Sequence, residues 1–367
     1  KKKMKKIGII TYHFANNYGA VLQCYALQTY LTQRGFKVTV FNFISEKQAK
    51  NNDVIKHGKS AKSVIANNCL LPFSHYIRKK HKSYQKFCQK DLNITPHFTE
   101  VRDLQKYIEN NGYDFIVSGS DQVLNPNIDD FELAFLYPFS TKAKKIAYAA
   151  STGNATQQDI GKIQRYLNDF AKISIREQKD LVKFDSALKE QIVVVCDPVM
   201  LLNADAWTKM LLNRKVEKPY LACYFLHKNL FNEEFKAAKK ISKQLGLEMR
   251  VINARFGINS LRKGTIFDAG PKEFVDLIAN ANYVCTDSFH GTLFSLIFHK
   301  QFSSFDTKNN HFDSRKKGLL ESVGAMKAYQ IVEEPLKVCN EIDYKEVDIK
   351  MEKMRADATK FWEILDE

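Results

Sequence analysis

Apolar and polar residues alternate in blocks along the chain, and the blocks fit strands and helices in turn. The first apolar run, residues 6–11, is followed by a stretch at 18–34 whose apolar residues recur at helical spacing. Gly35 ends that helix, and the run at 37–43 predicts a second strand. A strand, a helix and a second strand in this order are typical of a parallel α/β unit.

The alternation resumes after a polar, lysine-rich excursion at 46–96, for which we expect helices outside the sheet. Further strands of this first series are predicted at residues 113–118, 145–149, 172–175 and 192–195, with a helix from about residue 157. Asp197-Pro198 interrupts the pattern, so we place a domain boundary near Asn203.

A second alternating series follows this boundary. Its strands are predicted at 220–225, 249–252, 283–286 and 301–305, and its helices at 232–245, 271–280 and 291–298. We therefore predict an α/β fold of two Rossmann-like, doubly wound domains, at residues 1–203 and 204–340. The segment 341–367 is predicted as a C-terminal helix that packs back on the first domain, because an apolar stripe follows its charged face.

Length and charge narrow the class of protein. A chain of 367 residues exceeds what one hydrophobic core usually serves, in agreement with two domains. Its net charge of +15 favours contact with phosphates, anionic glycans or the surface of an anionic membrane, a peripheral membrane contact. Nucleic acid is not expected as a partner, because the sequence has no zinc-finger spacing, no RNP-like aromatic stretch and no helix-turn-helix.

The seven cysteines are scattered and never form a Cys-x-x-Cys pair. This distribution argues against a disulfide framework and against a zinc site. It predicts a cytoplasmic protein, and the sequence predicts no bound metal.

The turns after strands hold the candidate chemistry, because ligands of doubly wound sheets bind beyond the carboxyl ends of the strands. The first turn carries Asn16, Asn17, Tyr18 and Gly19. Free N–H groups at a helix start attract phosphate or carboxylate. Capping of the helix by Asn17 explains its presence equally well.

Two more turns of the first series carry polar residues. Asp121 and Gln122 lie in a tight bend after an apolar strand, and a binding function is favoured there over a solvated turn. Arg176 closes another apolar strand, where a guanidinium suits a phosphate or carboxylate. An ion pair of Arg176 with Glu177 or another acid explains it equally well.

The turn at 286–291 leads from the strand at 283–286 into a helix. His290 lies near the N-terminus of that helix, where the dipole favours a neutral imidazole that can take up or release a proton. Gly291 lets a ligand or a backbone segment approach closely. Asp287 and Ser288 can cap the helix.

Five short motifs occur in order along the chain. They are Tyr18-Gly19-Ala20-Val21-Leu22-Gln23 with Ala26-Leu27-Gln28, Gly119-Ser120-Asp121-Gln122, Ser174-Ile175-Arg176-Glu177, Asp197-Pro198-Val199, and Thr286-Asp287-Ser288-Phe289-His290-Gly291-Thr292. Through their order and spacing the chain resembles the polysaccharide pyruvyl transferase family over most of its length. The resemblance implies a GT-B-like fold in which two Rossmann-like domains face each other across a cleft, the first on the acceptor side and the second on the donor side.

The resemblance also implies an activity. Pyruvate is transferred from phosphoenolpyruvate to a sugar of a capsule or exopolysaccharide, or to its lipid-linked precursor, as a ketal, with no metal or redox cofactor. Such chemistry needs cations for the donor's phosphate and carboxylate, an acid for its methylene carbon and a base for a sugar hydroxyl.

The residue roles follow by position in the motifs. Arg176 resembles the family's phosphate-binding arginine, and His290 resembles the histidine that binds the donor and acts in acid–base catalysis. Asp121 is assigned to the acceptor hydroxyl, as its base or hydrogen-bond acceptor. Ser288 stands where many members have arginine; Arg315 could replace that charge, or could equally be a solvated residue at a helix start. The other assigned residues are Ser288, Phe289 and Gly291 for the donor, and Asn16, Asn17, Tyr18, Gly19 and Gln122 for the acceptor or a phosphate.

Two other functions fit the same residues. A GT-B glycosyltransferase with a nucleotide-sugar donor shares the fold, and fold alone does not separate the two activities. A noncatalytic module that binds a glycan or phosphate is the second alternative, and it predicts binding without turnover.

Overall fold

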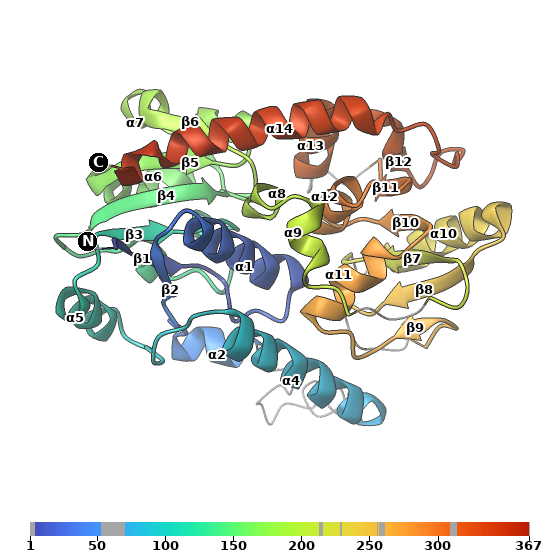
Figure 1. Cartoon of the computed structure of the whole chain (residues 1–367), viewed down its shortest axis with the longest axis horizontal. Helices are drawn as coiled ribbons and strands as arrows, with labels where there is room; N and C mark the ends of the chain where they lie inside the picture. The colour runs from blue at the N-terminus through green and yellow to red at the C-terminus, as the bar shows by residue number, and fades with distance from the viewer. Residues whose placement is uncertain are drawn as a thin grey trace. The chain divides into compact units, whose positions relative to one another are not determined.

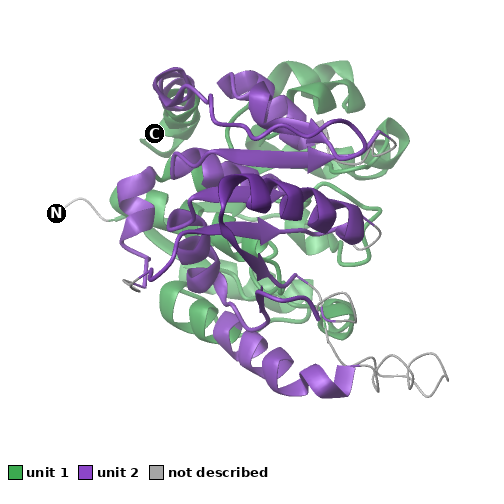
Figure 2. Ribbon diagram, turned by 90° about the vertical axis from the view of Figure 1, so that its right-hand side faces the viewer, with its two compact units in different colours: residues 1–55, 85–202, 354–367 green, residues 56–84, 203–353 purple. Residues whose placement is uncertain are grey.

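The computed structural model describes residues 4–52, 70–212, 216–227, 230–254, 256, 261–308 and 314–366. The chain divides into two compact units, which Figure 2 colours separately. Unit 1 consists of residues 1–55, 85–202 and 354–367, and unit 2 of residues 56–84 and 203–353.

The described part of unit 1 is built on a parallel sheet with the strand order β2-β1-β3-β4-β5-β6 (Figure 1). The strands are β1 Lys6–Ile10, β2 Lys37–Val40, β3 Phe115–Ser118, β4 Lys144–Ala150, β5 Phe170–Ile175 and β6 Ile192–Val194. The chain moves outward in one direction from β1 to β2 and in the other from β3 to β6. The turns after β1 and β3 therefore separate at the switch point of the sheet, where ligands of this fold class bind.

Helices connect these strands, and their apolar residues close the core of unit 1. They are α1 Tyr18–Gln33, α2 Glu46–Asn52, α5 Val101–Asn111, α6 Gln157–Ile163, α7 Ser186–Gln191 and α8 Pro198–Leu201. α1 begins after Asn17, whose side chain accepts a hydrogen bond from the N–H of Gly19. Burial of each large apolar side chain, such as Leu22 or Leu27 of α1, contributes about 2 kcal/mol.

The described part of unit 2 is built on a second parallel sheet, with the order β12-β11-β10-β7-β8-β9. The strands are β7 Tyr220–Tyr224, β8 Glu248–Ile252, β9 Thr265–Ile266, β10 Tyr283–Thr286, β11 Phe302–Asp306 and β12 Tyr329–Ile331. Counted from β7, this is the 3-2-1-4-5-6 order of a dinucleotide-binding sheet. Its switch point lies between β7 and β10.

The helices of unit 2 bury an aromatic cluster beside this sheet. They are α9 Ala204–Thr208, α10 Phe231–Leu245, α11 Pro271–Ala279, α12 Phe289–Ile297 and α13 Ser314–Val323. Phe294 of α12 is fully buried, with its ring centroid 4.9 Å from that of Trp207 and 5.9 Å from that of Phe274. These contacts fix the orientation of α12, whose first turn carries the polar residues discussed below.

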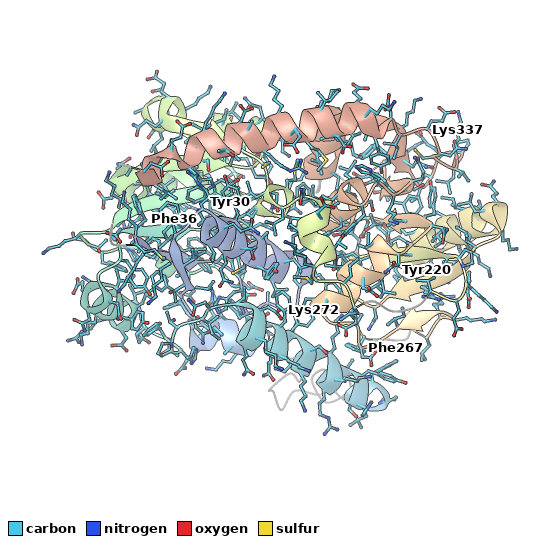
Figure 3. The ribbon with its side chains drawn as sticks, in the orientation of Figure 1. Tyr30, Phe36, Tyr220, Phe267, Lys272 and Lys337 are labelled. Atoms are coloured by element: carbon cyan, nitrogen blue, oxygen red, sulfur yellow. The ribbon has the colours of Figure 1, made fainter. Side chains whose placement is uncertain are left out.

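Two helices have residues in both units, α4 Ser74–Asp91 and α14 Tyr344–Phe361. The last residues of the chain, from 354, belong to unit 1, where Tyr148 stacks on Trp362 at 4.7 Å. In the same unit, the hydroxyl of Tyr30, labelled in Figure 3, lies 3.2 Å from Thr359 Oγ1. Of the excursion at 46–96, α2 belongs to unit 1 and α4 begins in unit 2, while residues 53–69 lie outside the described residues.

The predicted class of two Rossmann-like, doubly wound domains is confirmed, and each predicted strand is present within about three residues of its expected ends. The pattern missed β9 and β12, which have two and three residues and sit at opposite edges of one sheet. α12 begins at Phe289, two residues before its predicted start, because Ser288 caps it. His290 is therefore a residue of the first helical turn.

Candidate functional site

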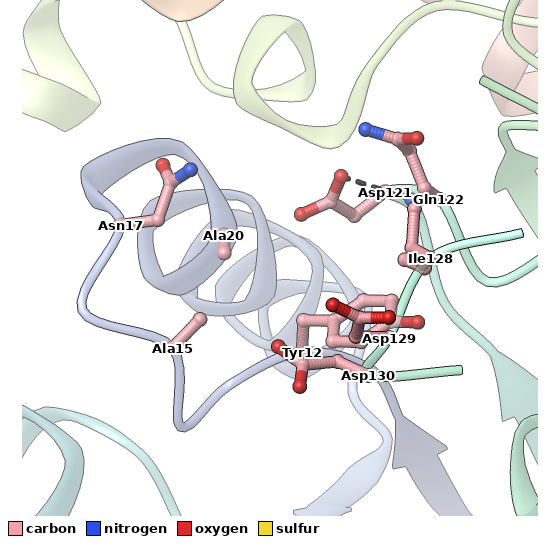
Figure 4. Close-up of a pocket in the computed structure, with 9 residues that line it drawn as sticks. All are labelled: Tyr12, Ala15, Asn17, Ala20, Asp121, Gln122, Ile128, Asp129 and Asp130. Carbon is pink, nitrogen blue, oxygen red and sulfur yellow. Dashed lines mark hydrogen bonds between the residues drawn. The ribbon is translucent and has the colours of Figure 1, made fainter. Parts of the chain in front are cut away.

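A cavity of about 200 Å³ lies at the switch point of unit 1. Its walls come from the turn after β1, the start of α1 and the loop after β3, and Figure 4 shows Asp121 pointing toward α1. The polar residues that line it are Tyr12, Asn17, Asp121, Gln122, Asp129 and Asp130. Three of these six carry carboxylates, so the cavity is acidic although the chain as a whole is basic.

Asp121 adopts an uncommon backbone conformation at the edge of this cavity. Its φ of +74° lies in the left-handed region, and its Oδ1 accepts a hydrogen bond from the N–H of Gln122 at 2.9 Å. Its carbonyl accepts the N–H of Ser151 at 2.9 Å, beside a bulge of β4 where Ala149 has a φ of +48°. Such conformations cost about 1 kcal/mol or more, and the surrounding hydrogen bonds hold this one in place.

The chemistry of the cavity suits a ligand rich in hydroxyl groups. Burial, and then the charges of Asp121 and Asp130, raises the pKa of Tyr12, so its hydroxyl keeps its proton. Among the described residues, this buried hydroxyl has no hydrogen-bond partner. Tyr12 can therefore donate to a ligand while the carboxylates accept from it, and the same carboxylates repel an anion such as phosphate.

Only some of the residues predicted for this region line the cavity. Asn17, Asp121 and Gln122 do. The capping of α1 by Asn17 is confirmed, and its contact with a ligand stays a prediction. Tyr18 is 1% exposed, because it packs in the first turn of α1 with Gly19.

Neither Tyr18 nor Gly19 is among the lining residues, and Asn16 is also absent from them. Sequence reasoning missed three residues that do line the cavity, Tyr12, Asp129 and Asp130. The adjacent carboxylates were the only available signal, because their loop has no periodicity.

Arg176 lies in unit 1, beyond the end of β5, with its charge already paired. Its Nε is 2.8 Å from Glu177 Oε1 and one of its terminal nitrogens is 2.6 Å from Asp197 Oδ2. Burial alone lowers the pKa of Arg176, but the charges of Glu177, Asp197 and Asp121 outweigh burial and raise it. The guanidinium, 4% exposed, is therefore held in an ion-pair network that joins two of the five motifs. The ion pair with Glu177, weighed as an alternative, is present.

The turn at 286–291 of unit 2 is fixed by side-chain hydrogen bonds. Ser288 Oγ accepts a hydrogen bond from the N–H of Gly291 at 3.3 Å, and the N–H of Ser288 donates to Thr286 Oγ1 at 3.1 Å. A Cβ atom at Gly291 would lie 2.4 Å from Thr286 Oγ1, so glycine is needed where α12 approaches β10. Ser288 and Gly291 thus have structural roles, and their binding of the donor stays a prediction.

His290 and Arg315 flank Phe289 at the start of α12. The rings of Phe289 and His290 meet edge to face at 5.2 Å, and the Arg315 guanidinium carbon lies 5.9 Å from the Phe289 ring centroid. Both polar side chains are half-buried. The structure therefore places the Arg315 guanidinium beside Phe289 of the first turn of α12, and its role in replacing a charge at Ser288 stays a prediction.

Asp287 joins the two strand ends at the switch point of unit 2. Its carboxylate is 1% exposed and accepts hydrogen bonds from the N–H groups of Leu226, at 2.7 and 2.9 Å, and His227, at 2.8 Å. The ring nitrogen Nδ1 of His227 lies 2.7 Å from Asp287 Oδ2. Glu234 of α10 lies beside this pair, and burial, followed by the charge of Asp287, raises the pKa of Glu234 to about 9.

Sequence reasoning missed His227 and Glu234. They lie 60 and 53 residues before Asp287, and no spacing links them. Among the described helices, none combines the length and the apolar character needed to cross a bilayer.

Comparison with known proteins places these features in a family. A family model described as polysaccharide pyruvyl transferase matches residues 17–309, which include all five motifs, while Arg315 lies just beyond the match. No curated protein matches the chain in sequence.

Solved structures resemble the fold. A putative UDP-N-acetylglucosamine 2-epimerase from Listeria monocytogenes has a TM-score of 0.54 at 10% identity, covering 98% of this chain and 90% of that chain. The UDP-GlcNAc 2-epimerase from Neisseria meningitidis, bound to UDP-GlcNAc, has a TM-score of 0.55 at 8% identity, covering 99% and 100%. At such low identity the likeness shows the fold alone, a GT-B-like pair of Rossmann-like domains.

Proposed function

Because this chain belongs to the polysaccharide pyruvyl transferase family, we propose that it transfers pyruvate from phosphoenolpyruvate to two hydroxyls of a sugar, as a ketal. The family makes the chain a transferase with a sugar or polysaccharide acceptor. The phosphoenolpyruvate donor, a capsule, exopolysaccharide or lipid-linked acceptor and the cytoplasmic location belong to the proposal.

The first turn of α12 is the observation that carries the donor assignment. Its N-terminus presents the positive end of a helix dipole, which attracts phosphate and carboxylate groups. His290 lies in this turn and Arg315 beside it, which adds a cation and a group that exchanges protons. Phosphoenolpyruvate carries a phosphate and a carboxylate, so it suits this combination.

The acidic cavity of unit 1 supports the acceptor assignment. Its carboxylates can accept hydrogen bonds from sugar hydroxyls, and Tyr12 can donate one. Asp121, held in its left-handed conformation beside the cavity, is the proposed base.

The proposed reaction conserves protons and bonds. His290 donates a proton to the methylene carbon of phosphoenolpyruvate, which becomes a methyl group, and one sugar hydroxyl attacks the neighbouring carbon. The second hydroxyl forms the other bond of the ketal while the bond from that carbon to the phosphate oxygen breaks. Asp121 accepts the proton of the first hydroxyl, and the proton of the second hydroxyl leaves with the phosphate. Proton exchange with solvent then restores His290 and Asp121.

The role of Arg176 as a phosphate ligand stays a prediction. Glu177 and Asp197 already share its guanidinium, and a phosphate has to compete with both of them. Arg315 lies beside Phe289 of the first turn of α12, which supports it as the donor cation.

The proposal is tested by incubating the protein with phosphoenolpyruvate and candidate glycans. We expect release of inorganic phosphate together with an acid-labile ketal on the glycan, and loss of both with His290→Ala. Phosphate release that is unchanged in that variant contradicts the assignment of His290. In a thermal-shift comparison we expect stabilisation by phosphoenolpyruvate; stabilisation by UDP alone supports transfer from a nucleotide sugar instead.

A further inference from the structure

Three side chains that can bind a metal converge at the switch point of unit 2. His227 follows β7, Glu234 lies in α10 and Asp287 follows β10, and one ligand atom from each lies within 4.8 Å of the others. The cluster lies outside the acidic cavity of unit 1 and includes neither His290 nor Arg315. Its residues come from three separate segments, which is why cysteine and histidine spacing did not reveal it.

Glu234 is the least explained member of the cluster. Its side chain is fully buried, and among the described residues neither of its carboxylate oxygens has a hydrogen-bond partner. A buried carboxylate is costly unless hydrogen-bond donors or a cation compensate for the lost water. Glu234 therefore points to a ligand that the protein itself does not supply.

His227 and Asp287 offer the other two ligand atoms. His227 Nδ1 lies 2.7 Å from Asp287 Oδ2, yet the nitrogen is not aligned for a hydrogen bond with any described group. The backbone N–H groups of Leu226 and His227 hold the Asp287 carboxylate in place. Hydrogen bonds of this kind orient a ligating carboxylate in metal sites.

The charges around Glu234 leave room for a cation. Asp287 and Asp306 are the carboxylates that act on it, and Lys316 is the cation. Lys316 is buried and donates to the carbonyl of Phe305. One ammonium group thus faces three carboxyl groups, which can compensate the charge of a bound cation.

We propose that His227, Glu234 and Asp287 bind a divalent transition-metal ion such as Zn²⁺ or Mn²⁺. One imidazole nitrogen and two carboxylates form a ligand set that suits these ions, and three protein ligands leave coordination positions open. The side chain of His227 is 33% exposed, which gives the ion a route from solvent. Asp287 directly precedes the turn that carries His290; if the proposed function holds, the ion supplies positive charge where Ser288 replaces the family arginine.

Metal binding is measured on the full chain without any substrate. The protein is stripped with a chelator, and Zn²⁺ and Mn²⁺ are then titrated by calorimetry, with metal content and melting temperature as further readouts. We expect about one ion per chain, a higher melting temperature with metal, and an affinity at least about tenfold lower in His227→Gln and Glu234→Gln.

His299→Gln is the matched control. His299 Nε2 lies 2.9 Å from Asp348 Oδ1 in the same unit, but both side chains are about half exposed, and no third ligand from the described residues joins them. We expect this variant to bind metal as the wild type does. Should Glu234→Gln fail to fold, His227→Gln decides, because His227 is partly exposed.

Two results overturn the site. One is a wild type that binds neither ion, and the other is His227→Gln binding as tightly as the wild type. In either case Glu234 and Asp287 form a buried carboxyl pair that shares a proton. Because no donor or acceptor is present in the titration, a protein without pyruvyl transfer can still bind the metal, and the two failures are distinguishable.

Discussion

The switch points of the two sheets occupy the same place in the fold but expose opposite chemistry. In unit 1 the cavity is lined by Asp121, Asp129 and the Tyr12 hydroxyl. In unit 2 the basic side chains of His227, His290 and Arg315 are half-buried, while the carboxylates Asp287 and Glu234 are buried. In the proposed function, the same parallel-sheet edge recognises hydroxyl groups in unit 1 and anions in unit 2.

The two turns also differ in how they are held. Asp121 takes a left-handed conformation that places its carboxylate at the cavity, whereas the turn of unit 2 is an ordinary helix start capped by Ser288. The strained conformation of Asp121 supports its proposed role at the cavity. In the proposed function, His290 and the N-terminus of α12 are the binding elements of the second turn.

The largest expected effect concerns Arg176, the buried cation of unit 1, which also contains the acidic cavity. Replacement by Ala leaves Glu177 and Asp197 buried without their partner, so we expect a loss of about 3 to 5 kcal/mol in the free energy of unfolding. Denaturant unfolding measures it, with the exposed Arg165→Ala as a control that changes stability by less than about 0.5 kcal/mol. A stable Arg176→Ala protein that has lost affinity for phosphoenolpyruvate makes Arg176 a donor ligand and moves a donor cation into unit 1.

Asp121→Asn removes the proposed base from the acidic cavity of unit 1 without changing the shape of the side chain. Asn tolerates a left-handed conformation as Asp does, so we expect stability to be kept and ketal formation to fall about 10²- to 10⁴-fold. Steady-state rates of ketal formation measure this, and Asp129→Asn is the control with a smaller loss of rate. Equal rates for Asp121→Asn and the wild type remove Asp121 from the mechanism.

Lys80 adds a buried cation at the carboxyl edge of unit 2. Its ammonium donates to the carbonyl of Asn253, directly after β8, and burial lowers the pKa of Lys80 to about 7. Between pH 7 and about 10.4 the unfolded chain holds this proton more tightly than the folded one, so stability rises with pH. Relative to Lys80→Met, we expect the wild type to gain about 2 kcal/mol in unfolding free energy from pH 7 to 9.

The neighbouring Lys79 provides the control for that pH dependence. It is exposed and paired with Asp268, so Lys79→Met should follow the wild type between pH 7 and 9. Parallel pH profiles for Lys80→Met and the wild type show that Lys80 keeps its charge in the folded state.

The smallest effect is expected for a substitution of Ser288 in unit 2. This substitution distinguishes a structural role of Ser288 from a role in binding the donor. Ser288→Ala removes the cap of α12 and should cost about 1 kcal/mol, with the KM for phosphoenolpyruvate unchanged. Asn203→Ala removes the cap of α9 and serves as the comparison. A raised KM with unchanged stability identifies Ser288 as a donor ligand instead.

Much of the fold could be predicted from hydrophobic periodicity, because buried apolar strands alternate with amphipathic helices along the chain. This alternation is typical of parallel α/β sheets. The turn at 286–291 and the bend at Asp121 were found because polar residues follow apolar strands there. β9 and β12 were not predicted, because such short edge strands have too few residues to show an alternating pattern.

The parts of the site that could not be predicted depend on contacts between distant segments. Glu234 looks like an ordinary acidic residue in the first turns of α10, and only folding places it beside Asp287. Asp129 lies in an irregular loop that the sheet brings against Tyr12. The sequence also gives no sign that Arg176 is paired with Asp197, because Asp197 lies 21 residues further along the chain.

The division of labour between the two units is tested most directly by the KM values of both substrates in two variants. We predict that Arg315→Met raises the KM for phosphoenolpyruvate at least about tenfold and leaves the acceptor KM unchanged. Asp129→Asn should raise only the acceptor KM, because its carboxylate lines the cavity of unit 1. If Arg315→Met instead raises the acceptor KM, or Asp129→Asn raises that for phosphoenolpyruvate, the assignment of donor and acceptor to the two units is wrong.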